Sequence, residues 1–124
     1  MHPGELPLTG AHLTESISGA MVDLYTEVYG DQNTTATTYI NDNVVVCVLE
    51  SILSPREASQ VEAGKSGEVI DGRVAFQTGA EDEFTAAVER LTRRKVTAFM
   101  SANQTTPGIA CELFFLEAPP LTVA

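Results

Sequence analysis

The sequence of 124 residues has no tryptophan, only two histidines and two cysteines, and only 7 basic residues against 17 acidic ones. Its net charge of −10 repels phosphate backbones and anionic lipid headgroups. The basic residues cluster only in "RLTRRK", Arg90 to Lys95, which follows a predicted helix end, where cations interact favourably with the helix dipole. We therefore expect no nucleic-acid partner.

The sequence offers few residues for metal binding or nucleophilic catalysis. His2 and His12 both lie in the N-terminal segment, and Cys47 and Cys111 are far apart and form no CxxC pair. Zinc-ligand spacing and a Ser-His-Asp arrangement are both missing. Each cysteine lies in an apolar run, where a thiol behaves as a small hydrophobic group. We expect structural thiols, no metal, no cofactor and no catalytic residue, and hence a protein that is not an enzyme.

Long hydrophobic runs are also missing. The longest, "VVVCVL" at Val44 to Leu49, is far shorter than the roughly 20 residues that span a bilayer. The N-terminal "MHPGELPLTGAHLTES" has neither the positive start nor the apolar centre of a signal peptide. These features predict a soluble, cytoplasmic protein without direct membrane insertion.

The composition that remains, 44% hydrophobic and 19% charged, is typical of a globular domain. We expect an extended N-terminal arm over residues 1–13, one domain over residues 14–117 and a short tail over residues 118–124. The first predicted helix is capped by Thr14 and begins near Glu15. Its apolar residues recur at three- and four-residue spacing on one face: Leu13, Ile17, Met21, Leu24 and Val28.

Two β-hairpins are predicted. Threonine-rich residues 34–40 and apolar residues 44–52 flank Asn41-Asp42-Asn43, which is turn chemistry. Residues 96–101 and 109–117 form the second pair, joined through "ANQTTPG", a loop of about six residues whose Pro-Gly pair indicates a turn.

Helices are predicted between the hairpins. Ser54-Pro55 begins one that ends near Ala63. "GKSG" at residues 64–67 lacks the first glycine of a phosphate-binding loop, because Ser59 stands there, and so predicts a helix break. Residues 68–92 are helical, with a possible break at Thr78-Gly79. Their predicted buried side carries Ile70, Val74, Gln77, Ala80 or Glu81, Phe84, Val88 and Leu91, with Ala87 beside them.

The order helix, hairpin, helix, hairpin predicts an α+β fold, a four-stranded antiparallel sheet with helices on one face. "VVCVL" and "IACEL" place Cys47 opposite Cys111 and suggest a possible internal duplication. The free sheet face, or an edge strand, is the expected surface of a homodimer.

Glu112 is the candidate centre of a site, because it lies in mid-strand on the face opposite Cys111. It is either a solvent-facing strand carboxylate or a carboxylate paired with Arg73 or Arg94 beneath a small pocket. Further polar side chains are expected to add hydrogen bonds there. The candidate ligand-binding set is Tyr39, Arg73, Gln77, Ser101, Asn103 and Glu112.

Several segments together carry a family likeness: "AMVDLYTEVYG", "TYINDNVVVCVLESILSPREA", "RVAFQ" and "FTAAVERLTRRKVTAFMSANQTTPGIACELFFLE". From about Ser16 to Glu117 the chain resembles the MpsC-type domain family, most tellingly in "VExLTxRxVxxFMSxN" at Val88 to Asn103. The resemblance implies a small bacterial protein, long described as a domain of unknown function. It also implies association with a cation-translocating, membrane-potential-generating system linked to bicarbonate uptake. It supplies no catalytic residues.

Three functions follow as hypotheses. The leading one is a non-catalytic accessory or regulatory domain, a homodimer that acts with a membrane transport complex or another protein partner. The alternative is a sensor for a small anion or metabolite, in which Arg73 lines a pocket for bicarbonate or a carboxylate. The third is an unrecognised enzyme, which lacks a catalytic constellation.

Overall fold

The structure, a computed structural model, describes residues 9–118. It contains four helices and four strands within that range, in the order α1 (Gly10–Tyr29), β1 (Thr35–Asn41), β2 (Val44–Glu50), α2 (Pro55–Glu62), α3 (Ser66–Gly79), α4 (Glu81–Thr92), β3 (Val96–Thr105) and β4 (Gly108–Leu116). The predicted arm falls mostly, and the tail almost wholly, outside the described residues.

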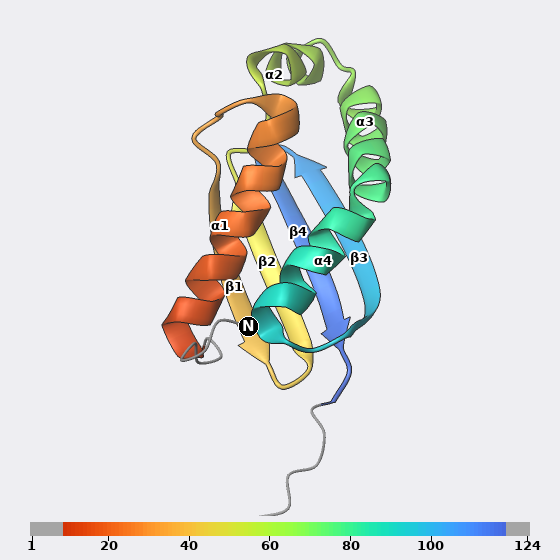
Figure 1. The fold of residues 1–124 in the computed structure, drawn as a ribbon. Helices are drawn as coiled ribbons and strands as arrows, with labels where there is room; N and C mark the ends of the chain where they lie inside the picture. The colour runs from red at the N-terminus through yellow and green to blue at the C-terminus, as the bar shows by residue number, and fades with distance from the viewer. Residues whose placement is uncertain (1–8, 119–124) are drawn as a thin grey trace, which may run out of the picture.

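The four strands form one antiparallel sheet in the order β1-β2-β4-β3, so that two hairpins lie side by side with β2 and β4 in the centre. Helices α1, α3 and α4 lie over the same face of this sheet, and α2 sits at one end (Figure 1). The predicted α+β fold with its four-stranded antiparallel sheet is confirmed.

The core lies between the sheet and the helices. Side chains alternate along each strand, so that every second residue of β2 and β4 faces α1 and α4. The largest fully buried apolar side chains of this layer are Ile17, Met21, Val45, Leu49, Ile52, Phe84, Val88 and Phe114. Ring contacts join Tyr25, Phe76, Phe84, Phe99 and Phe114 into a chain that links α1, α3 and α4 to the sheet.

The first helix begins earlier than predicted. Helix α1 starts at Gly10, and Thr14 does not cap it; the Thr14 hydroxyl instead donates to the carbonyl of Ala11 inside the first turns. Val28 and Val74, both predicted to be buried, are 58% and 49% exposed. Helical periodicity alone did not place these two residues correctly, because the buried face of each helix is rotated slightly from the predicted one. In α1 the buried face follows Ile17, Met21 and Tyr25, and in α3 it follows Val69, Arg73 and Gln77.

The second hairpin is longer than predicted. Strand β3 runs to Thr105 and β4 begins at Gly108, so most of the expected loop is strand. The predicted equivalence of the two cysteines is also wrong. Cys47 is buried under the helices, whereas Cys111 lies next to the buried Glu112 and faces the other side of the sheet. The "VVCVL" and "IACEL" segments are therefore out of phase in the structure.

Candidate functional site

Glu112 is the centre of a buried polar cluster between the sheet and helices α1 and α3. Its side chain is 0% exposed. Oε1 accepts hydrogen bonds from the Tyr25 hydroxyl at 2.9 Å and from Gln77 Nε2 at 2.8 Å, and Oε2 accepts one from the Ser101 hydroxyl at 2.5 Å. Both alternatives expected for Glu112 are therefore wrong, since it is neither exposed to solvent nor paired with Arg73 or Arg94.

Asn103 extends the cluster along β3. Its Nδ2 donates to Gln77 Oε1 at 2.7 Å, and its Oδ1 accepts from Gln77 Nε2 at 3.0 Å. Two reciprocal hydrogen bonds thus join the amides of Gln77 and Asn103 and hold the Gln77 amide beside Glu112. Only neutral donors surround the Glu112 carboxylate in this cluster.

Burial raises the pKa of Glu112 to about 7, and the hydrogen bonds from Ser101, Tyr25 and Gln77 offset only part of that rise. The same environment raises the pKa of Tyr25, first through burial and then through the neighbouring Glu112, so its hydroxyl stays protonated and donates. A carboxyl group in this state changes charge near neutral pH. Perturbed groups of this kind are candidates for functional residues.

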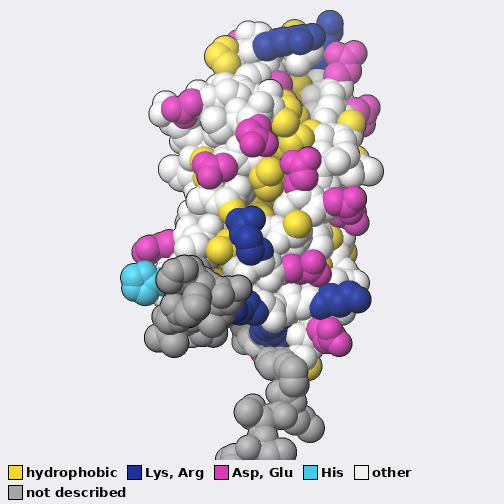
Figure 2. All heavy atoms as spheres, viewed as in Figure 1, with side chains coloured by type: hydrophobic (Ala, Val, Ile, Leu, Met, Phe, Trp, Pro, Cys, Tyr) yellow, Lys and Arg dark blue, Asp and Glu magenta, His cyan; other side chains and the backbone are white. Residues whose placement is uncertain are grey.

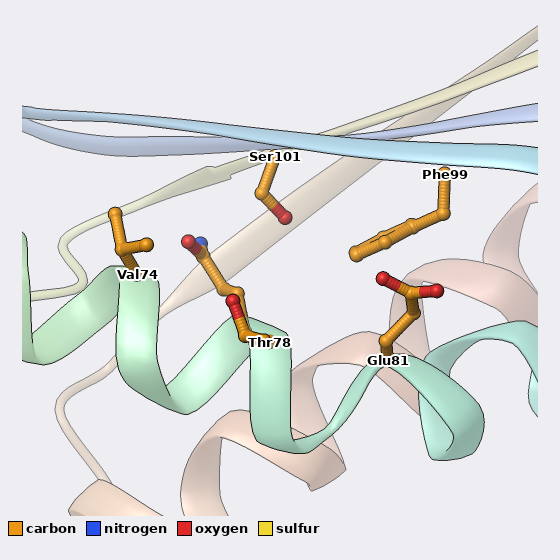
Figure 3. A pocket seen from close by; sticks show the side chains of 6 residues that line it. Val74, Thr78, Glu81, Phe99 and Ser101 are labelled. Carbon is orange, nitrogen blue, oxygen red and sulfur yellow. The ribbon is translucent and has the colours of Figure 1, made fainter.

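A shallow pocket of about 200 Å³ lies beside the cluster, between α3, the start of α4 and β3. Gln77 and Ser101 form its inner wall, and Val74, Thr78, Glu81 and Phe99 complete the lining. Figure 3 shows the Ser101 hydroxyl and the Glu81 carboxylate pointing into the gap between helix and strand, with the Phe99 ring beside Glu81. The lining holds one carboxylate and no cationic side chain.

Arg73 lies apart from this pocket and serves a second buried carboxylate. Its guanidinium donates to Glu57 from Nε at 2.8 Å and from Nη2 at 2.6 Å, and also to the carbonyl of Ile52. The Tyr29 ring covers it, with Cζ 3.5 Å from the ring centroid. Glu57 in turn closes a capping box with Ser54 at the start of α2. Arg73 thus links its own helix, α3, to α2 and to the segment that follows β2.

The structure brings together four of the six predicted site residues: Gln77, Ser101, Asn103 and Glu112. Arg73 belongs to the Glu57 pair, and Tyr39 is 61% exposed on the other side of the sheet, so neither joins them. Arg94 donates to the carbonyls of Asp42 and Glu117 at the far end. Sequence reasoning missed Tyr25 and Glu57, although Tyr25 lies one helical turn after Met21 and Glu57 is the third residue of a capping box.

The sheet face away from the helices, here called the open face, is the other distinctive region. The strand register arranges its side chains in rows that run across all four strands. Three neighbouring rows contain no charged residue: Asn41, Val44, Phe115 and Ala98; Tyr39, Val46, Leu113 and Met100; Thr37, Val48, Cys111 and Ala102. Charged residues border these rows at both ends: Glu50 lies in the next row at one end, and Asp42 and Glu117 lie just beyond Asn41 and Phe115 at the other.

The open face is unusual for so acidic a chain. Tyr39 and Met100, at the two ends of the middle row, are 61% and 52% exposed. The helix-covered side looks different, because Asp and Glu side chains are spread over both of its flanks (Figure 2). A contiguous exposed apolar surface generally marks an interaction site.

The described residues contain neither a metal-binding cluster nor a helix that could span a membrane. No three His, Cys, Asp or Glu side chains within residues 9–118 are grouped so as to hold a metal ion. Over the same residues, no helix combines the length and hydropathy that crossing a bilayer requires.

Comparison with known proteins gives a family but no characterised relative. A family model described as "Na+-translocating membrane potential-generating system (MpsC)" matches residues 9–118, which covers all eight helices and strands. No curated protein and no solved structure matches the chain. Because the match spans most of the sequence, the chain belongs to the MpsC family.

Proposed function

We propose that this chain is a non-catalytic accessory or regulatory protein of a membrane-potential-generating transport system, and that it works from the cytoplasm through protein–protein contacts. The observation that carries the proposal is the open face, where three rows of side chains carry no charge on a chain of net charge −10. Such a surface suits a protein partner, because apolar area at the centre of an interface supplies most of the binding free energy.

The buried cluster supports the non-catalytic part of the proposal. Glu112 accepts three hydrogen bonds, and the Gln77 and Asn103 amides satisfy each other. A fully connected buried network of this kind fixes the packing of helices on a sheet. In this role the polar side chains position α1 and α3 against β3 and β4 rather than bind a substrate.

The anion-sensor alternative receives less support. The expected cation, Arg73, is 1% exposed and neutralises Glu57. The pocket beside Gln77 and Ser101 presents the Glu81 carboxylate instead of a cation. An anion there would meet like charge, which raises the free energy of binding.

The proposal is tested by deleting the gene in its own host and measuring membrane potential with a potential-sensitive dye. Deletion is expected to lower the potential, and the unaltered gene to restore it. The variant Tyr39→Glu/Met100→Glu, which places two charges on the open face, is expected not to restore it. The matched control Val28→Glu/Val74→Glu changes two comparably exposed residues on the helices and should restore it.

Two results would overturn the proposal. A deletion strain with full membrane potential would show that the chain does not contribute to the system for which its family is named. The second result is a folded Glu112→Gln protein that fails to restore the potential, together with a Tyr39→Glu/Met100→Glu protein that restores it. This result would show that the function depends on the buried cluster and not on the open face.

A further inference from the structure

We infer that the occupant of the open face is a second copy of this chain, packed sheet against sheet. The inference rests on the proposed function and names the partner at that surface. It also specifies an arrangement: a twofold axis parallel to the strands, running between β2 and β4, so that β1 of one copy lies over β3 of the other.

The charge distribution leaves the open face as the surface on which two copies can pack. Each copy carries a net charge of −10, so two copies can approach closely only where carboxylates are absent. The three uncharged rows of the open face meet this condition. A basic partner would instead gain most from a surface that displays Asp and Glu, as the helix-covered side does (Figure 2).

The pattern of side-chain sizes suits the proposed twofold axis. The axis keeps each row opposite itself and reverses its order, so Tyr39 of one copy meets Met100 of the second copy, and Val46 meets Leu113. A thioether against an aromatic ring is a favourable contact. Small side chains, Ala98 and Ala102, flank Met100 on its own strand, which leaves room for the large Tyr39 ring. The interface is therefore self-complementary, as a twofold dimer requires.

The area is consistent with a weak dimer. Three rows of four side chains, on strands about 4.8 Å apart and with rows about 7 Å apart along each strand, cover on the order of 400 Å² of plane per copy, or about 800 Å² over two copies before side-chain relief is added. That value lies below the range of permanent interfaces, so we expect a dimer that dissociates on dilution.

The first experiment measures mass in solution by light scattering and analytical ultracentrifugation over a range of concentrations. The full chain is expected to move from one to two chain masses as concentration rises. Tyr39→Glu/Met100→Glu is expected to raise the dissociation constant at least about 100-fold, because it buries four unpaired carboxylates in the dimer. Val28→Glu/Val74→Glu adds the same charge outside the open face and should leave the constant unchanged.

The second measurement uses the cysteines as internal reporters. Cys111 is a partly buried free thiol on the open face, and Cys47 is a buried thiol on the helix side. In the concentrated protein, Cys111 is expected to be protected from a maleimide, and dilution or Tyr39→Glu/Met100→Glu should remove that protection. Cys47 should remain unreactive in every folded sample, which also shows that each variant folds.

The outcomes separate this inference from the proposed function. A protein that stays monomeric with a reactive Cys111 at all concentrations overturns the dimer. So does a dimer that survives Tyr39→Glu/Met100→Glu but is broken by Val28→Glu/Val74→Glu. If Tyr39→Glu/Met100→Glu still abolishes the membrane-potential phenotype in a strictly monomeric protein, the dimer is wrong, while an interaction role of the open face stands with a different protein as partner.

Discussion

Two buried glutamates in this fold have the same number of described hydrogen bonds and opposite titration behaviour. Glu57 is 9% exposed and Glu112 is 0% exposed, and each accepts three hydrogen bonds. The pKa of Glu57 lies below its ordinary value, whereas the pKa of Glu112 is raised to about 7. The charge of the donors, more than their number, therefore decides whether a buried carboxylate is ionised.

The physical reason lies in the donors. Burial raises the pKa of both carboxyl groups, because it removes water from the charged form. At Glu57 the Arg73 guanidinium and the Ser54 capping bonds outweigh that effect. At Glu112 the donors are a phenol, an amide and a hydroxyl, and their hydrogen bonds do not. Glu57 is thus a permanent ion-pair partner, and Glu112 is a group that ionises near neutral pH.

Removing the cation should have the largest effect. Arg73→Met leaves Glu57 without its counter-charge in a nearly closed site, and we expect a loss of about 3–5 kcal/mol in the free energy of unfolding. The pKa of Glu57 should then rise, as that of Glu112 does. Urea denaturation followed by circular dichroism measures the loss.

Arg56→Met is the matched control, because Arg56 is an exposed arginine on the same helix as Glu57. Its expected effect is within about 0.5 kcal/mol. Equal, small losses for Arg73→Met and Arg56→Met would show that the guanidinium does not determine the state of Glu57.

The pH dependence of stability should separate the two carboxylates next. Between about pH 4.5 and about pH 7, folded Glu112 keeps a proton that the unfolded chain has released, so its contribution to stability falls by up to about 3 kcal/mol as pH rises. Glu112→Gln should remove this fall and gain stability relative to the unaltered protein at about pH 8 but not at about pH 5. Unfolding free energies at the two pH values check the difference.

Glu57 should show the opposite sign. Its folded pKa is lowered, so its contribution is present above the pKa of the unfolded chain and is lost as pH falls through the folded value. Glu57→Gln should therefore cost most at neutral pH and least in acid. Identical pH profiles for Glu57→Gln and Glu112→Gln would remove the distinction drawn between the two sites.

Local sequence signals predicted the elements of this fold well. The Asn41-Asp42-Asn43 turn, the Ser54-Pro55 helix start and the break at Gly79 all lie where the chain chemistry put them, because each depends on neighbouring residues only. Long strands were less well predicted. Residues 102–105, of which three are polar, were predicted as a loop, but pairing with β4 makes them part of a strand.

The candidate site was predictable only in part, because it depends on contacts distant in sequence. Strand alternation correctly placed Glu112 opposite Cys111, and the helical spacing of Gln77 pointed it inward. No local sequence signal shows that the Tyr25 hydroxyl bonds to Glu112, 87 positions away. Nor does any show that Arg73 pairs with Glu57 instead of Glu112. Partner choice among buried polar groups is set by how the helices lie on the sheet, which no single segment encodes.

The smallest expected effects come from a matched pair of serine substitutions. Ser101→Ala removes one neutral donor from Glu112, whereas Ser54→Ala removes the hydroxyl oxygen that accepts from the Glu57 backbone N–H in the capping box and leaves the donors to the Glu57 carboxylate in place. At about pH 8, where Glu112 is ionised, Ser101→Ala should cost about 1–2 kcal/mol, and at about pH 5 distinctly less, because a protonated carboxyl needs that donor less. Ser54→Ala should cost about 1 kcal/mol at both pH values, since the Arg73 guanidinium keeps Glu57 ionised.

Urea denaturation at both pH values measures the four losses. A loss for Ser101→Ala that does not change with pH would mean that Glu112 has the same charge at both, and the contrast with Glu57 would then depend on packing rather than on the charge of the donors.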